Sequence, residues 1–179
     1  MPPHCDSMDG PVVTAAAKAL EATDARLVLP FVPKEGEPEV LKAFEQTTAA
    51  RKLGSEAREV ADRYFFETVV RIHRAGEGAP YTGLKPAGLD VGPVIGVAER
   101  AISVGAPDAL VELLTNELAA EIRGRFTEML RLQARADGDV EANREYVEAM
   151  LGLQVWAHSL HESIHSYPHE HAHENAHAH

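Results

Sequence analysis

The sequence predicts an all-α fold, a helical bundle built from two tandem three-helix repeats. Apolar residues recur at helical spacing in most segments, residues that start and stop helices stand at the segment ends, and the second half of the chain repeats the pattern of the first. The length of 179 residues is usual for one domain. We therefore expect a single all-α domain over residues 1–165, followed by a His-rich tail over residues 166–179.

Three helices are expected in the first half. Asp9 stands before a Gly-Pro pair and an alanine-rich run that ends at Ala22, and an Asp N-cap with an early Pro suits a first helical turn. A Glu-Pro pair opens a second helix, which Gly54 closes. Ser55 is expected to cap a third helix that ends at Arg74, in which apolar residues recur every three or four positions.

The segment RLVLPFV, residues 26–32, is the only plausible strand, and Pro30 in its middle argues against a strand. We interpret the segment as a short buried helix or an extended connector. In the second half, helices are expected over residues 93–104, 108–135 and 139–161.

An internal repeat appears when the sequence is shifted by 82 positions, the offset that places Gly10 on Gly92. The repeats cover about residues 10–74 and 92–156, and a Gly/Pro-rich loop over residues 75–91 joins them. Identities in this register include the pairs Glu35/Glu117, Glu39/Glu121, Phe44/Phe126, Glu59/Glu141 and Tyr64/Tyr146. The alternative is that two amphipathic segments align through their shared periodicity.

The aligned halves differ in chemistry, because the first half keeps ionisable side chains where the second has mostly apolar ones. The aligned pairs are Arg51/Gln133, Lys52/Ala134, Glu67/Ala149, Arg71/Leu153, His73/Val155 and Arg74/Trp156. A solvated helix face explains some of these charges, and Glu67 with Arg71 has the spacing of a surface ion pair. The imidazole of His73 is expected to point inward, either as a core histidine or as a metal ligand, because apolar residues precede it on one helical face.

Composition and charge exclude several classes of function. The formal charge of −11 argues against nucleic acid as a partner. No apolar run approaches the roughly 20 residues that a membrane span needs, and the first residues lack the pattern of a signal peptide. The single cysteine suits a reducing compartment. We expect a cytoplasmic protein that binds metal ions or small molecules, and the sequence leaves open whether it forms a homo-oligomer.

The N-terminal residues His4, Cys5 and Asp9 form a candidate metal site. Imidazole, thiolate and carboxylate together favour a transition metal, and the sequence does not distinguish nickel, zinc, copper and iron. The segment HCDSMDGPV resembles the nickel hook that opens the nickel superoxide dismutases, which are also helical. His4 and Cys5 match that hook, whereas Asp9 stands in the place of the family's second cysteine. The alternative is that Asp9 only caps a helix and Cys5 is incidental.

A broader resemblance covers about residues 4–160. The segments HCDSMDGPV, RKLG, YFFETVVRIHRAGEGAPYTGLKP and REYVEA resemble the pattern of an uncharacterised bacterial family, a domain of unknown function. This resemblance implies one domain and implies no particular activity.

The loop over residues 75–91 is long for a joint between helices, and loops of this length are usually functional or disordered. In the functional interpretation, the loop covers a pocket in which His73 joins the N-terminal ligands. In the alternative interpretation, it is a plain linker between the repeats.

Two further roles are assigned around this pocket. The candidate catalytic residues are Tyr81, Arg71 and Glu67. Arg74 and Lys85 are the candidates to attract a small anion.

The tail holds imidazoles that chelate nickel, zinc or copper without a fold. The tail ligands that we expect are His169, His171, His173, His177 and His179. An engineered tag is the alternative.

Two classes of function remain. In the first, the protein binds one transition metal and acts as a metal-dependent oxidoreductase on a small oxidant or anion. In the second, it stores or transfers metal ions without catalysis, using its His-rich tail.

Overall fold

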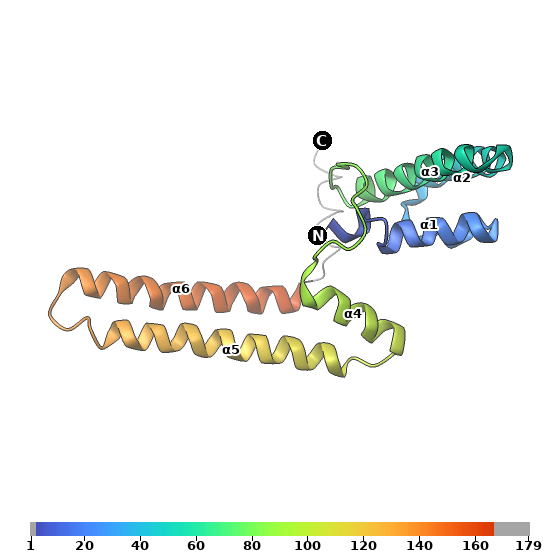
Figure 1. Cartoon of the computed structure of the whole chain (residues 1–179). Coiled ribbons are helices and arrows are strands. Elements are labelled where there is room, and N and C mark those ends of the chain that lie inside the picture. The colour runs from blue at the N-terminus through green and yellow to red at the C-terminus, as the bar shows by residue number, and fades with distance from the viewer. Residues whose placement is uncertain (1–2, 167–179) are drawn as a thin grey trace. The chain divides into compact units, whose positions relative to one another are not determined.

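The computed structural model describes residues 3–166, and this part of the chain is all-α. It contains no strand, only an isolated bridge between Ser7 and Lys85. None of the described helices is both long enough and apolar enough to cross a membrane. The chain divides into two compact units, unit 1 over residues 1–91 and unit 2 over residues 92–179, which are described separately (Figure 1).

Unit 1 contains three α-helices and five short 3₁₀ turns. In chain order they are η1 (Pro3–Asp6), α1 (Pro11–Ala22), η2 (Ala25–Leu27), η3 (Leu29–Phe31), η4 (Lys34–Gly36), α2 (Glu37–Ala50), η5 (Arg51–Leu53) and α3 (Ser55–Gly76). The loop of residues 77–91 completes the unit.

The segment between α1 and α2 reverses the chain through 3₁₀ turns. RLVLPFV forms most of η2 and η3, so it is a turned connector and not a strand. Pro30, Pro33 and Gly36 interrupt the α-helical hydrogen-bond pattern here, because proline has no backbone N–H to donate and glycine disfavours helix. The reversal lets α1 pack against α3.

The core of unit 1 fills the space between its three helices. Phe44 on α2 and Phe65 on α3 meet edge to face, with ring centroids 5.7 Å apart. The remaining core side chains are mainly small or β-branched, and they include Val12, Val13, Ala16, Ala19, Leu20, Val40, Ala43, Val69, Val70 and Ile72. Arg51 links the C-terminal end of α1 to α3. It donates a hydrogen bond to the Leu20 carbonyl at 2.9 Å and forms an ion pair with Asp62 of α3 at 2.8 Å.

The two expected N-caps of unit 1 are corrected by the structure. Asp9 does not cap α1, because Gly10 is the N-cap residue and the Asp9 carboxylate instead accepts a hydrogen bond from the backbone N–H of Gly88 at 2.8 Å. Ser55 is already the first residue of α3, and its hydroxyl donates to Glu56. In both cases a neighbouring glycine takes the cap position.

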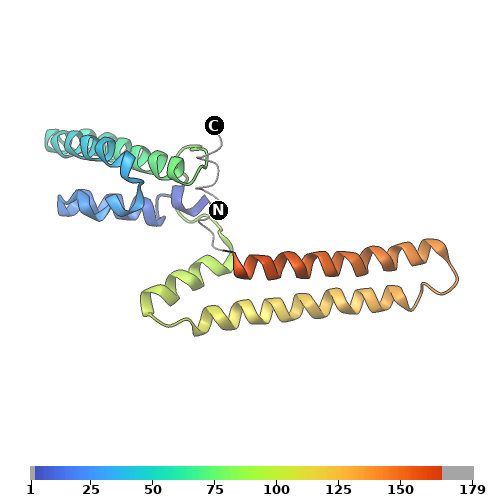
Figure 2. The ribbon, with the colours of Figure 1, turned by 180° about the vertical axis from the view of Figure 1, so that it is seen from behind.

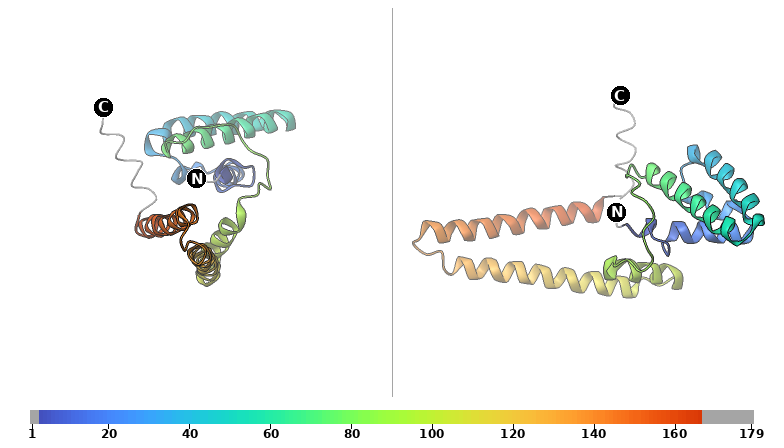
Figure 3. Two further views of the ribbon diagram at one scale, coloured as in Figure 1. Left: turned by 90° about the vertical axis from the view of Figure 1, so that its left-hand side faces the viewer. Right: turned by 45° about the horizontal axis from the view of Figure 1, so that its top comes forward.

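Unit 2 consists of α4 (Gly92–Val104), α5 (Asp108–Gln133) and α6 (Val140–His165). α5 and α6 form a long antiparallel hairpin, which Figures 2 and 3 show from behind and along its axis. Asp139 caps α6 by accepting hydrogen bonds from the N–H groups of Glu141 and Ala142. Among the described residues of this unit, only Met129 and Ala136 are buried.

The contact between Gly10 and the backbone of His4 generates a first prediction. A Cβ atom at Gly10 would lie 1.8 Å from the His4 carbonyl oxygen, so Gly10→Ala must push η1 off α1. We expect unit 1 to lose about 2 kcal/mol or more of stability. Hydrogen exchange of α1, followed by mass spectrometry, measures this loss.

Gly124→Ala is the matched control. Gly124 lies within α5 and a Cβ there meets nothing within 4 Å, so the substitution should stabilise unit 2 by about 1 kcal/mol. The fluorescence of Trp156, the one tryptophan of the chain, reports unfolding of unit 2. Gly10→Ala should not change the unfolding transition of unit 2 that Trp156 reports. If hydrogen exchange in α1 is the same in Gly10→Ala as in the wild type, the prediction is wrong.

Candidate metal centre

Cys5, His73 and Glu77 bring three potential metal ligands together in unit 1. One ligand atom from each side chain lies within 4.8 Å of the other two. Cys5 comes from η1, His73 from the last turn of α3, and Glu77 from the residue that follows α3. This is the only group of three or more such ligands within residues 3–166.

The imidazole of His73 is held in the tautomer that metal binding requires. Its Nδ1–H donates to the Phe31 carbonyl at 2.7 Å, because a carbonyl can only accept. In the neutral ring the lone pair is therefore on Nε2. This atom lies 3.3 Å from a Glu77 carboxylate oxygen, is buried, and has no partner with hydrogen-bond geometry. A buried nitrogen lone pair aimed at a thiol and a carboxylate is suited to a cation.

Arg74 joins the two segments that supply the ligands. Its Nε contacts Asp6 at 2.6 Å and its Nη1 contacts Glu77 at 3.1 Å. Arg74 and Asp6 are only 5% and 3% exposed, so their ion pair is buried. Arg74 thereby holds the η1 backbone beside α3 and orients the Glu77 carboxylate.

The loop of residues 77–91 binds the other side of the N-terminal segment. The N–H of Lys85 donates to the Asp6 carbonyl at 2.8 Å, and the N–H of Met8 donates to the Lys85 carbonyl at 3.0 Å. The bond from Gly88 to Asp9 extends this contact. Cys5 is consequently enclosed, with 7% of its surface exposed.

Enclosure changes the chemistry of the thiol. Burial raises the pKa of Cys5 above its ordinary value, and the nearby Glu77 carboxylate raises it further. The metal-free thiol therefore keeps its proton at neutral pH and is a poor nucleophile. A bound cation would displace that proton and stabilise the thiolate.

Two of the four predicted metal ligands, Cys5 and His73, lie together, whereas His4 and Asp9 contribute no atom to the cluster. The Nδ1 atom of His4 is nonetheless buried without a hydrogen-bond partner. Glu77 was not among the predicted ligands. The sequence feature that could have identified Glu77 as a ligand is its i,i+4 spacing from His73, which places both side chains on one face at the end of α3.

The predicted catalytic residues lie outside the cluster. Arg71 pairs with Glu39 at 2.5 Å and Glu67 pairs with Arg63 at 3.0 Å, so the expected Glu67–Arg71 pair is not formed. Tyr81 packs against the core of unit 1, and burial raises its pKa, with the charge of Glu67 adding to the shift.

The predicted anion-binding residues are both engaged. The guanidinium of Arg74 is paired with Asp6 and Glu77, which leaves it little positive charge for an anion. The Lys85 ammonium donates to the Thr82 carbonyl at 3.1 Å and lines a pocket of about 450 Å³ beside α3. The predicted tail ligands, His169, His171, His173, His177 and His179, lie outside the described residues.

The buried ion pair generates the second prediction. Asp6→Ala should destabilise unit 1 by about 3 kcal/mol, because Arg74 stays buried with Glu77 as its remaining partner. Glu141→Gln, which removes the partner of Arg144 from an exposed pair, is the control and should change little. Urea unfolding followed by hydrogen exchange in α3 provides the measurement, and equal behaviour of the two variants would show that the pair contributes no stability.

The comparisons with known proteins give a family and no activity. Residues 9–156 match a family described as a family of unknown function, DUF6448. No curated protein and no solved structure matches the chain. Because the match covers most of the chain, the protein belongs to this family of unknown function, DUF6448.

Proposed function

We propose that unit 1 binds one transition metal ion through the Cys5 thiolate, the His73 Nε2 atom and the Glu77 carboxylate. The observation that carries the proposal is the buried, unpartnered Nε2 atom, because leaving a buried polar atom unsatisfied costs about 1–3 kcal/mol. The hydrogen bond from Nδ1 to Phe31 prevents the ring from relieving this cost by changing tautomer. A cation between the three groups would satisfy all of them.

The ligand types define the class of metal. One sulfur, one nitrogen and one oxygen donor favour zinc, nickel, copper or iron, whereas calcium and magnesium prefer oxygen donors alone. Three protein ligands leave a fourth position for water or a substrate, which is the pattern of catalytic sites. A fourth protein ligand would instead give the closed site of a structural or storage protein.

This distinction separates the two functions that we consider. With an open fourth position, the protein would act as a metal-dependent oxidoreductase on a small oxidant or anion. Of the three predicted catalytic candidates we retain Tyr81, because its side chain packs against the core of unit 1, whereas Arg71 and Glu67 form exposed ion pairs. With a closed site, the protein would store or transfer metal with the help of the His-rich tail.

We further propose that the two units descend from a duplicated three-helix repeat. Both α1 and α4 begin at a Gly-Pro pair, and both end before a residue of left-handed conformation, Thr23 with φ 53° and Gly105 with φ 74°. The same offset of 82 positions separates Thr23 from Gly105 and Gly10 from Gly92. Val155 and Ser159 stand in unit 2 where His73 and Glu77 stand in unit 1, so only one unit would bind the metal.

The third prediction tests the ligand set with Co²⁺. The wild-type protein should show a thiolate-to-cobalt charge-transfer band, which Cys5→Ala should abolish and which His73→Ala and Glu77→Gln should shift while weakening affinity at least about tenfold. The protein is prepared without an affinity metal column, both as the full chain and without residues 167–179. The shortened protein should keep one tight site.

Asp9→Asn and His158→Ala are the matched controls, since one changes a carboxylate outside the cluster and the other a histidine of unit 2. Both should retain the wild-type spectrum. The proposal fails if Cys5→Ala and His73→Ala bind cobalt as tightly as the wild type. Loss of all metal on removal of residues 167–179 would favour the storage function alone.

The fourth prediction concerns pH. Because the folded-state pKa of the Cys5 thiol is raised, metal binding at neutral pH must release its proton, so affinity should rise about tenfold per pH unit over roughly pH 7 to 8.5. Titrations in several buffers measure the released proton. Cys5→Ala should lose this dependence, and a wild-type affinity that does not change with pH would show that the thiol is not a ligand.

A further inference from the structure

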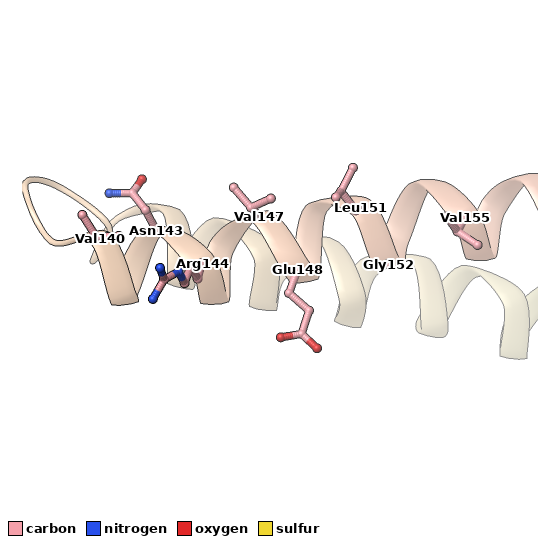
Figure 4. A pocket seen from close by; sticks show the side chains of 8 residues that line it. All are labelled: Val140, Asn143, Arg144, Val147, Glu148, Leu151, Gly152 and Val155. Atoms are coloured by element: carbon pink, nitrogen blue, oxygen red, sulfur yellow. The ribbon is translucent and has the colours of Figure 1, made fainter.

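The helix α6 changes character along its length. Its first part is apolar on one side. Figure 4 shows Val147 and Leu151 projecting from that side, where they line a shallow groove of about 730 Å³ whose lining residues end at Val155. The last two turns of α6 carry histidines instead, at positions 158, 161 and 165. None of these histidines belongs to the candidate metal centre of unit 1.

His161 and His165 form a close pair on one face of α6. Residues four apart are neighbours on a helix surface. The centroids of the two rings lie 4.5 Å apart, and the ring planes are inclined at 66°. Both side chains are exposed, and neither ring has a hydrogen-bond or ion-pair partner within residues 3–166. The ring nitrogens are therefore available to a ligand.

Two imidazoles at this spacing can bind one metal ion. Histidines at positions i and i+4 of a helix hold zinc in the HExxH motif, and residues 161–165 spell that pattern. Bonds of about 2.1 Å to a tetrahedral ion place two ligand nitrogens roughly 3.4 Å apart. Side-chain rotation brings two rings this close together to such a separation. Imidazole ligands favour zinc, nickel or copper over calcium and magnesium, which prefer oxygen.

The surroundings of the pair favour a cation. His165 is the last residue of α6, and the C-terminal end of a helix carries a partial negative charge from its unpaired carbonyls. Glu162 lies in the same turn and has no ion-pair partner within the described residues. Glu117 of α5 lines a groove of about 760 Å³ together with Leu160 and Ile164 of α6. No lysine or arginine follows position 144 in the sequence.

We infer that His161 and His165 form a second metal site, which binds a zinc, nickel or copper ion at the end of α6. The inference does not rest on the proposed function of unit 1, because the two sites share no residue. Two protein ligands leave the other coordination positions to water, so the ion is bound more weakly than by three ligands and exchanges readily. Catalytic zinc sites hold three protein ligands, and no third lies with this pair among residues 3–166. The site therefore captures and releases ions and does not catalyse hydrolysis.

The fifth prediction tests this site by calorimetric titration with Zn²⁺. The reference protein is the full chain with alanine in place of the tail histidines, so that the tail does not compete for the ion. His161→Ala and His165→Ala should each weaken one binding event at least about tenfold, because the ion loses one of the two ligands of a chelate. His158→Ala is the matched control, since its ring has no contact with the pair, and it should leave this event unchanged. His73→Ala should also leave it unchanged, which separates this site from the centre of unit 1.

Hydrogen exchange gives a second readout that a merely structural role of the pair would not change. An ion that bridges positions 161 and 165 should slow amide exchange in the last turn of α6, and EDTA should reverse the effect. His161→Ala should abolish this response to Zn²⁺. The inference is overturned if His161→Ala and His165→Ala bind Zn²⁺ as tightly as the reference protein, or if His158→Ala weakens binding as much as they do.

Discussion

The buried ion pair between Arg74 and Asp6 is the constraint on which the candidate metal centre depends. It is the ion pair that links η1 to α3, whereas the other contacts of η1 are with α1, the core and the loop of residues 77–91. The pair sets the distance between the segment that holds Cys5 and the helix end that holds His73. Arg74 also contacts Glu77, so a single guanidinium positions ligands from two parts of the chain. The cost of burying this charge is recovered only when both acidic partners are in place.

Charge balance at the centre follows from the same arrangement. One guanidinium faces two carboxylates, and the Cys5 thiol stays protonated because burial and Glu77 disfavour a further negative charge. A divalent cation would convert the thiol into a thiolate while bringing the positive charge that the group lacks. Metal binding at this centre would therefore require release of the thiol proton.

The helices were predictable from the sequence because their signals are local, whereas the ligand set was not. The Gly-Pro starts, the glycine ends and the apolar periodicity place all six α-helices within a few residues of their observed bounds. The pairing of Cys5 with His73 was inferred from the ligand types near the N-terminus, the inward-facing histidine and the long loop that follows it. Glu77 was assigned to the loop, because the sequence does not show that α3 continues past Arg74. Asp9 was assigned to the metal, because only the folded loop shows its bond to Gly88.

The two units differ in how much of their apolar surface they bury. The core side chains of α1, α2 and α3 are buried in unit 1, whereas Met129 and Ala136 alone are buried among the described residues of unit 2. In unit 1 the chain reverses between α1 and α2 through a connector that holds helix breakers such as Pro33, whereas only residues 105–107 join α4 to α5. Under the proposed duplication, Val155 stands in unit 2 where His73 stands in unit 1, so the proposed metal ligands would belong to unit 1 alone.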